Sequence, residues 1–257
     1  YYLKAFYDGM TAEGDTMPIS LIRSAWAGSA KYGALVWSGD IVSTFECFRR
    51  QVQAGLNMAI AGIPWWTTDI GGFHGARTDD PDFHRLYIRW FEYGCFCPVM
   101  RLHGNRNPQE GYGAEQIGSG SDNEIWSFGD KAYEISKKYI FLRERLRDYI
   151  RTQMKKAHED GTPMMRPVFY DFPTDQESWN VEDAYLFGPD LYVAPVMEDH
   201  VTEREVYLPD GTAWFNAWTG EKYEGGQNVT VAAPLDTIPV FVKEGADAEK
   251  LLNIFSE

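Results

Sequence analysis

Acidic, cationic and imidazole side chains recur where short apolar runs end in the first 103 residues. The list is Arg23 after "ISLI", Asp40 after "ALVW", Asp69 after "GIPWW", and Arg101 and His103 at the end of "CPVMRL". If these runs are parallel strands of one barrel, their carboxyl ends meet on one face, where barrel enzymes carry their functional residues. We therefore expect the five side chains to share one rim.

Two carboxylates beside aromatic rings suit the cleavage of glycosidic bonds. One carboxyl group must protonate the leaving oxygen, while a second carboxylate attacks or stabilises the anomeric carbon. Asp40 follows Trp37 closely, and an apolar neighbour raises the pKa of an acid by disfavouring its charged form. Asp40 is thus a candidate proton donor.

Each of these residues also has a purely structural explanation. Gly and Asp commonly end strands, so Asp40 and Asp69 equally suit a turn or a helix cap. The two arginines suit structural ion pairs, and His103 suits an ordinary loop. Trp37 and Trp66 also fit the core.

Metal, nucleotide and serine-nucleophile chemistry find little support. His74 and His103 are not arranged as H-x-x-x-H or H-x-H, and Asp69 is followed by glycines instead of further oxygen ligands. No dinucleotide-binding or P-loop motif occurs. The "GSGSD" segment at 118–122 has no strand before it, as a nucleophile elbow requires. We therefore predict no metal and no cofactor.

Charge and composition exclude other partners. The formal net charge of −14 repels phosphate backbones, so nucleic-acid binding is disfavoured. No apolar run approaches the roughly 18 residues of a membrane span. The three cysteines, Cys47, Cys95 and Cys97, are too few for a disulfide framework and favour buried thiols in a reducing, cytoplasmic compartment.

The first part of the chain alternates between strand-like and helix-like segments. Strands are expected at 17–22, 34–37, 59–66, 96–102 and 163–172, and helices at 1–9, 43–59, 82–94 and 125–158. Apolar strands alternating with helices predict an α/β fold with a parallel sheet or barrel. Five strands are three short of an eight-stranded barrel, so we expect residues 1–186 to hold its later strands, with the rest before Tyr1.

The pattern changes after about Phe187. Short β runs such as "EREVYLP", "TAWFNAW" and "IPVFVKEG" are separated by Gly, Pro and Asp turns, with a helical tail at 247–255. This pattern is typical of an antiparallel β-sandwich. We therefore predict a second domain at 187–257.

Several segments resemble glycoside hydrolase family 31, which contains α-glucosidases and α-xylosidases. They are "RSAWAGSAKYGALVWSGD", "GIPWWTTDIGGF", "RWFEYGCFCPVMRLHG", "GTPMMRPVFYDFPTD", "LYVAPVMEDHVTEREVYLPDGTAWFNAWTG" and "APLDTIPVFVKEG". The blocks occur in the family's order along nearly all of the chain. The resemblance implies the later strands of a (β/α)8 TIM barrel followed by the family's C-terminal sandwich.

The resemblance also implies roles for individual residues. Asp40 matches the general acid/base, and Arg23 matches the arginine that contacts the sugar at the cleavage point. The expected substrate-binding set is Arg23, Trp37, Trp66, Asp69, Phe73, Arg101 and His103. In this set Trp37, Trp66 and Phe73 resemble the aromatic wall, Asp69 the aspartate at the base of the site, and His103 a ligand of ring hydroxyls. Arg101 joins the set through its place on the rim.

One element of the family pattern is missing. The nucleophilic aspartate belongs to an earlier strand, upstream of Tyr1, and neither Asp8 nor Asp15 matches it. We therefore expect a retaining α-glucosidase or α-xylosidase that needs the N-terminal remainder of the barrel, with the isolated chain inactive on α-linked oligosaccharides. A non-catalytic carbohydrate-binding fragment, an α-transglycosylase and an α-glucan lyase stay open. Glucose or xylose preference and homo-oligomer formation stay open as well.

Overall fold

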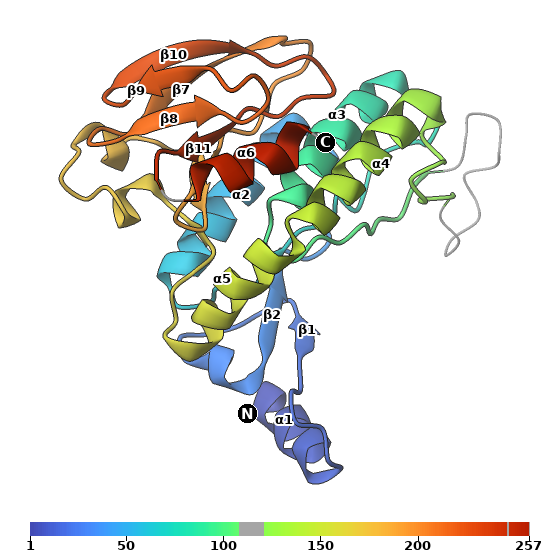
Figure 1. Ribbon diagram of the computed structural model, residues 1–257. Helices are drawn as coiled ribbons and strands as arrows, with labels where there is room; N and C mark the ends of the chain where they lie inside the picture. The colour runs from blue at the N-terminus through green and yellow to red at the C-terminus, as the bar shows by residue number, and fades with distance from the viewer. Residues whose placement is uncertain (108–120, 246, 257) are drawn as a thin grey trace.

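The computed structural model describes residues 1–107, 121–245 and 247–256. Figure 1 shows a small parallel sheet at one end of a layer of helices, with antiparallel strands packed over the opposite end of that layer. Helix α6 (Ala248–Ser256) lies between this antiparallel part and helix α4 (Gly129–Arg145). The chain thus has one part that resembles barrel strands and one antiparallel part.

The parallel sheet has the strand order β1-β2-β3. Its strands are β1 (Ser20–Ile22), β2 (Ala34–Trp37) and β3 (Trp66–Thr67). The pairs Ile22 with Val36 and Val36 with Trp66 fix a parallel register. Because all three strands run the same way, the loops that follow them emerge at one edge, as predicted.

Helices α2 (Phe45–Ile60) and α3 (Pro81–Cys95) confirm the predicted helices at 43–59 and 82–94. Thr44 Oγ1 accepts a hydrogen bond from Cys47 N and caps α2, while Asp80 caps α3 directly before Pro81 at the first helical position. Both are favoured helix starts. These caps fix where the loops after β2 and β3 end.

Two helix boundaries differ from the sequence prediction. Helix α1 (Tyr2–Ala12) continues through Gly9, since a single glycine weakens a helix without ending it. The helix predicted at 125–158 is two helices, α4 and α5 (Arg147–Glu159), separated at the buried Leu146. Leu146 keeps helical backbone hydrogen bonds on both sides, because its N donates to Leu142 O and its O accepts from Ile150 N. The apolar periodicity therefore continues across the interruption.

The antiparallel part contains a six-stranded sheet, β4-β5-β6-β11-β8-β9, and the pair β10-β7. The strands are β4 (Met165–Arg166), β5 (Tyr185–Phe187), β6 (Leu191–Val193), β7 (Glu203–Leu208), β8 (Ala213–Asn216), β9 (Lys222–Glu224), β10 (Gln227–Ala232) and β11 (Val240–Lys243). The antiparallel prediction is confirmed. Their packing as a sandwich stays a prediction.

Two predicted barrel strands are wrong. Met165 pairs antiparallel with Phe187, so β4 belongs to the second sheet and not to the barrel. Residues 96–102 form no strand, since turns follow α3 and Pro98 has no N–H to donate. This segment still runs beside β3, with Val99 N donating to Trp66 O at 3.2 Å. The division at 186/187 stays a prediction, and the pairing of β4 with β5 argues for an earlier one.

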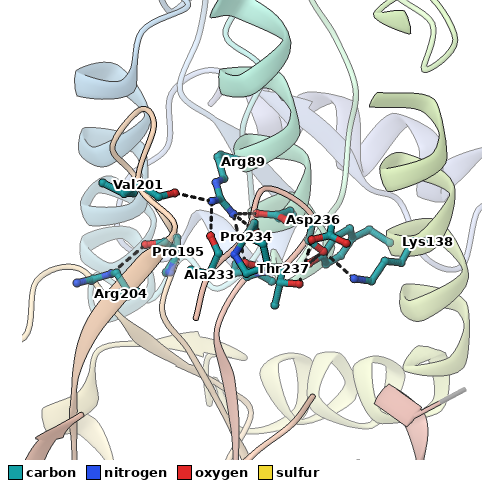
Figure 2. A network of polar contacts seen from close by, with 12 residues as sticks. Arg89, Lys138, Pro195, Val201, Arg204, Ala233, Pro234, Asp236 and Thr237 are labelled. Carbon is teal, nitrogen blue, oxygen red and sulfur yellow. Dashed lines mark hydrogen bonds and ion pairs between the residues drawn. The ribbon is translucent and has the colours of Figure 1, made fainter. Parts of the chain in front are cut away.

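Arg89 on α3 joins the helical layer to the antiparallel part, as Figure 2 shows. Its guanidinium is 3% exposed and donates to the carbonyl oxygens of Val201, Ala233, Pro234 and Thr237. Buried carbonyl groups that accept from a charged donor form strong contacts. The 233–237 loop is thereby fixed on the helices.

The three cysteines are free thiols that pack in the apolar interior. Cys95 and Cys97 are buried free thiols, and Cys47 is a partly buried free thiol. Burial raises the pKa of both buried thiols to about 12, which makes them poor nucleophiles.

Across the described residues, every helix is too short or too polar to cross a bilayer.

Candidate active site

The loops that follow β2 and β3 are joined by main-chain hydrogen bonds. Ile41 O accepts from Phe73 N at 2.7 Å and from His74 N at 2.9 Å, and Ser43 N donates to His74 O at 2.8 Å. Asp40 precedes Ile41, and Asp69 lies at the start of the loop that contains Phe73. The two acids are therefore held on neighbouring loops at one edge of the sheet.

Asp69 and Arg101 form the innermost part of this rim. Asp69 is completely buried, and Arg101 Nη2 donates to its Oδ1. Within the described residues, Asp69 Oδ2 and Arg101 Nε are buried atoms without a hydrogen-bond partner. A buried polar atom without a partner is costly, so these two atoms are candidates for hydrogen bonds to a ligand.

The charges of the rim act on one another. Burial raises the pKa of the Asp69 carboxyl above its usual range, while the positive charges of Arg101 and His103 oppose that rise. The negative charge of Asp40 adds to it. Asp40, Arg101 and His103 therefore all lie within electrostatic reach of Asp69.

Trp37 lies close to two arginines. The guanidinium carbons of Arg23 and Arg101 are 6.0 Å and 5.8 Å from its ring centroid, within the range of cation–π attraction. Gly39 makes the approach of Arg23 possible, because a Cβ at this position would lie 3.2 Å from Arg23 Nη2. Gly39 also has a φ of +84°, which side chains rarely adopt. The "WSGD" segment thus needs its glycine.

Phe73 and His103 form an aromatic edge of the rim. Their ring centroids are 5.3 Å apart, and the segment after His103 is tied to Phe73 because Asn105 N donates to Phe73 O at 2.9 Å. Asp40 and His103 are exposed, whereas Phe73 is partly buried. The edge is therefore open to a ligand.

Trp66 packs toward helix α2. It is 3% exposed and packs against α2, where a Cβ on Gly55 would come within 2.7 Å of Trp66 Nε1. Contact with the sugar stays a prediction for Trp66, as it does for the other members of the set. The packing against Gly55 shows a structural role.

Arg106 is a site residue that sequence reasoning missed. It is 1% exposed, and its Nη2 donates to Ile70 O, next to Asp69. The only signal in the sequence is one arginine among Gly and Asn in "HGNRN", a composition that also fits any exposed loop. Its burial depends on the folded arrangement of three loops.

The described residues contain no group of three or more His, Cys, Asp and Glu side chains that could hold a metal ion. The carboxylate of Asp69 instead faces a guanidinium and an imidazole. The "GSGSD" segment falls largely outside the described residues, which resume at Ser121. Carboxylates, cations and rings on one rim suit a polar ring such as a sugar.

Two family models match almost the whole chain. Residues 1–153 match the TIM-barrel domain of glycosyl hydrolases family 31, and residues 161–246 match the C-terminal domain of the same family. The parallel strands are thus part of a TIM-barrel glycoside hydrolase, to which the antiparallel strands add a C-terminal domain. The chain belongs to glycoside hydrolase family 31.

Relatives agree with this assignment. The structure of a family 31 α-xylosidase from a soil metagenome, complexed with xylose, is 52% identical with a TM-score of 0.91 and covers 98% of this chain. An α-xylosidase of Saccharolobus solfataricus is 38% identical over 95% of the chain, and α-glucosidase 2 of Bacillus thermoamyloliquefaciens is 35% identical over 89%. The chain spans 38%, 31% and 27% of these three proteins.

Proposed function

We propose that the complete protein is a retaining α-glycoside hydrolase that removes terminal α-linked glycosyl residues from oligosaccharides. Asp40 is the general acid/base, and the nucleophile is an aspartate outside these 257 residues. In the first step Asp40 protonates the leaving oxygen while the nucleophile attacks the anomeric carbon. In the second step Asp40 deprotonates the water that releases the sugar.

The observation that carries this proposal is the incomplete hydrogen bonding of Asp69 and Arg101. Asp69 Oδ2 accepts from no described group, and Arg101 Nε donates to none, although both atoms are buried. A sugar ring supplies hydroxyl groups that donate and accept, so one hydroxyl could satisfy the carboxylate and another the guanidinium. Such hydrogen bonds to charged groups contribute about 1.5–3 kcal/mol each.

The surrounding side chains suit the same ligand. Trp37 and Phe73 are partly buried rings on the segments that carry the acids, and rings of this kind stack on the apolar faces of sugars. Arg23 lies against Trp37 and the backbone of Gly39, directly before Asp40. We assign to Arg23 contact with the sugar and to Asp40, which is exposed, contact with the leaving group.

The names of two relatives favour xylose as the sugar. The structure with 52% identity is an α-xylosidase with bound xylose, and the Saccharolobus relative is an α-xylosidase too. The α-glucosidase at 35% identity keeps an α-glucoside as the alternative substrate. Both sugars belong in the assay.

The stereochemistry of hydrolysis tests the proposal. The complete protein, given 4-nitrophenyl α-xyloside and α-glucoside, should release the α-anomer first, as proton NMR during the first minutes would show. Release of the β-anomer would contradict the retaining mechanism. Sugar binding by calorimetry without turnover would favour the carbohydrate-binding alternative, and longer oligosaccharide products would favour a transglycosylase.

A further inference from the structure

Arg106 has a buried guanidinium with partners on three sides. Nε donates to Asn123 Oδ1 at 2.7 Å, Nη1 to Ser43 Oγ at 3.3 Å and Nη2 to Ile70 O at 3.2 Å. The group also lies 4.6 Å from the ring centroid of Phe83. Burial lowers its pKa to about 10, so it stays protonated at neutral pH.

Two of these contacts reach the loops that carry the acids. Ile70 directly follows Asp69, and Ser43 follows Asp40 by three residues. One planar side chain therefore joins the loop after β2 to the loop after β3. The charge of Asp69 also acts on Arg106 and raises its pKa against the effect of burial.

Arg106 also contacts its own segment of the chain, which carries His103. His103 lies three residues before Arg106, and Gly104 between them leaves room for the guanidinium. A Cβ on Gly104 would come within 2.5 Å of Arg106 Nη2. The segment with His103 is therefore packed on the same side chain.

The loops meet too closely for any side chain between them. Gly72 has a φ of +78°, and a Cβ there would lie 2.7 Å from the Cα of Ser43. A Cβ on Gly71 would lie 3.1 Å from Arg106 Nη2. The two glycines thus let the loops meet closely, and the guanidinium adds side-chain hydrogen bonds to the main-chain bonds that already join them.

We propose that Arg106 is a positioning residue that holds the loop of Asp40 at a fixed distance from the buried Asp69. The inference rests on the proposed role of Asp40 as the general acid. A guanidinium suits this position better than an ammonium because its planar fork donates in several directions at once, whereas the ammonium of lysine is a compact charge on a flexible stem. Arg106 itself does not contact the substrate.

The test compares two substrates in the complete enzyme. An aryl α-xyloside with a good leaving group needs little protonation, whereas an alkyl α-xyloside needs the acid. Arg106→Met should raise the ratio of kcat/KM between the aryl and alkyl substrates by about tenfold or more, because a displaced acid slows only the second reaction. Ser43→Ala, which removes one acceptor, should raise the ratio by a smaller factor.

The ratio separates positioning from folding, because a loss of folded enzyme lowers both rates equally. Arg166→Met serves as the matched control: its guanidinium is also buried, at 3% exposed, but donates to Asp171 and Pro163 O in the C-terminal part. We expect this variant to lose stability and keep the wild-type ratio. Arg106→Lys, which keeps the charge, should restore part of the loss.

An unchanged ratio in Arg106→Met and in Ser43→Ala would overturn the inference. If Arg106→Met does not fold, unchanged ratios in Ser43→Ala and Arg106→Lys would overturn the inference, and raised ratios would support it. Asp40→Ala is measured alongside. If Asp40→Ala leaves the aryl-to-alkyl ratio of kcat/KM unchanged, the proposed function is wrong and the inference is wrong with it. If Asp40→Ala raises this ratio strongly but the Arg106 and Ser43 variants do not, only the inference is overturned.

Discussion

Arg101 donates a hydrogen bond to Asp69, and the pair is only half completed by the described residues. The carboxylate is fully buried, the arginine side chain is 21% exposed, and each partner keeps one buried polar atom without a hydrogen bond. Unpaired buried groups cost free energy, and a ligand that donates to the carboxylate and accepts from the guanidinium would remove that cost. Under the proposed function, the pair is a preformed half of a ligand site.

Asp69→Asn tests the ligand role of the buried carboxylate. The substitution keeps the volume but removes the charge, so kcat/KM should fall by about 10- to 100-fold, as expected for losing a hydrogen bond to a charged group. Because burial already disfavours the charged carboxylate, the midpoint of thermal unfolding should stay within about 5 °C. Steady-state kinetics and calorimetry would measure both. A wild-type kcat/KM would remove Asp69 from the site.

Gly72→Ala tests the close packing of the two loops, with Gly62→Ala as its matched control. Both glycines have nearly the same φ, +78° and +77°, but a Cβ at Gly62 meets no atom within 4 Å. We expect Gly62→Ala to cost only about 1–2 kcal/mol from its left-handed backbone. Gly72→Ala should cost more and should also lower kcat, because it pushes Ser43 away. Equal unfolding free energies for the two variants, by urea titration, would contradict the packing argument.

Glu92 predicts how stability depends on pH. It is completely buried, and burial raises its pKa to about 8 against the opposing charges of Arg89 and Lys138. In the unfolded chain the carboxyl ionises near its ordinary value of 4.5, while the folded protein keeps it neutral until about pH 8. Its contribution to stability is therefore fully present below pH 4.5 and is lost as pH rises toward 8.

Glu92→Gln mimics the neutral carboxyl at every pH. The free energy of unfolding of this variant should exceed that of the wild type by a margin that grows between about pH 5 and pH 8, to on the order of 1 kcal/mol or more. Urea unfolding of both proteins at the two pH values measures the margin. A margin that does not change with pH would show that Glu92 does not titrate as described.

The sequence predicted the elements that depend on local signals. Strand β2 and the turn at Gly39 were visible in "ALVWSGD", and α2 was visible in its apolar periodicity and α3 as a helix-like segment at 82–94. The convergence of Asp40 and Asp69 followed from strand direction, because parallel strands end at one edge. Arg101 reaches the same edge although its segment forms no strand, because Val99 N donates to Trp66 O and Ile70 N donates to Arg101 O.

The parts that the sequence did not predict depend on distant partners. Met165 and Arg166 look like any apolar strand start, and only pairing with residues 186 and 187 makes β4 antiparallel. Arg106 has no local pattern at all, since three loops from different parts of the chain bury it. Periodicity records which face is buried, but not which sheet or loop covers it.

The most direct test of the central claim is the dependence of Asp40→Ala on the leaving group. In the complete enzyme, kcat/KM on a natural α-linked disaccharide should fall by about 100-fold or more, as expected for losing a general acid. The loss should be much smaller on an aryl α-glycoside whose leaving group needs no proton, and added azide should speed that reaction and yield an α-glycosyl azide. Equal losses on both substrates, with no effect of azide, would contradict the assignment of Asp40 as the acid/base.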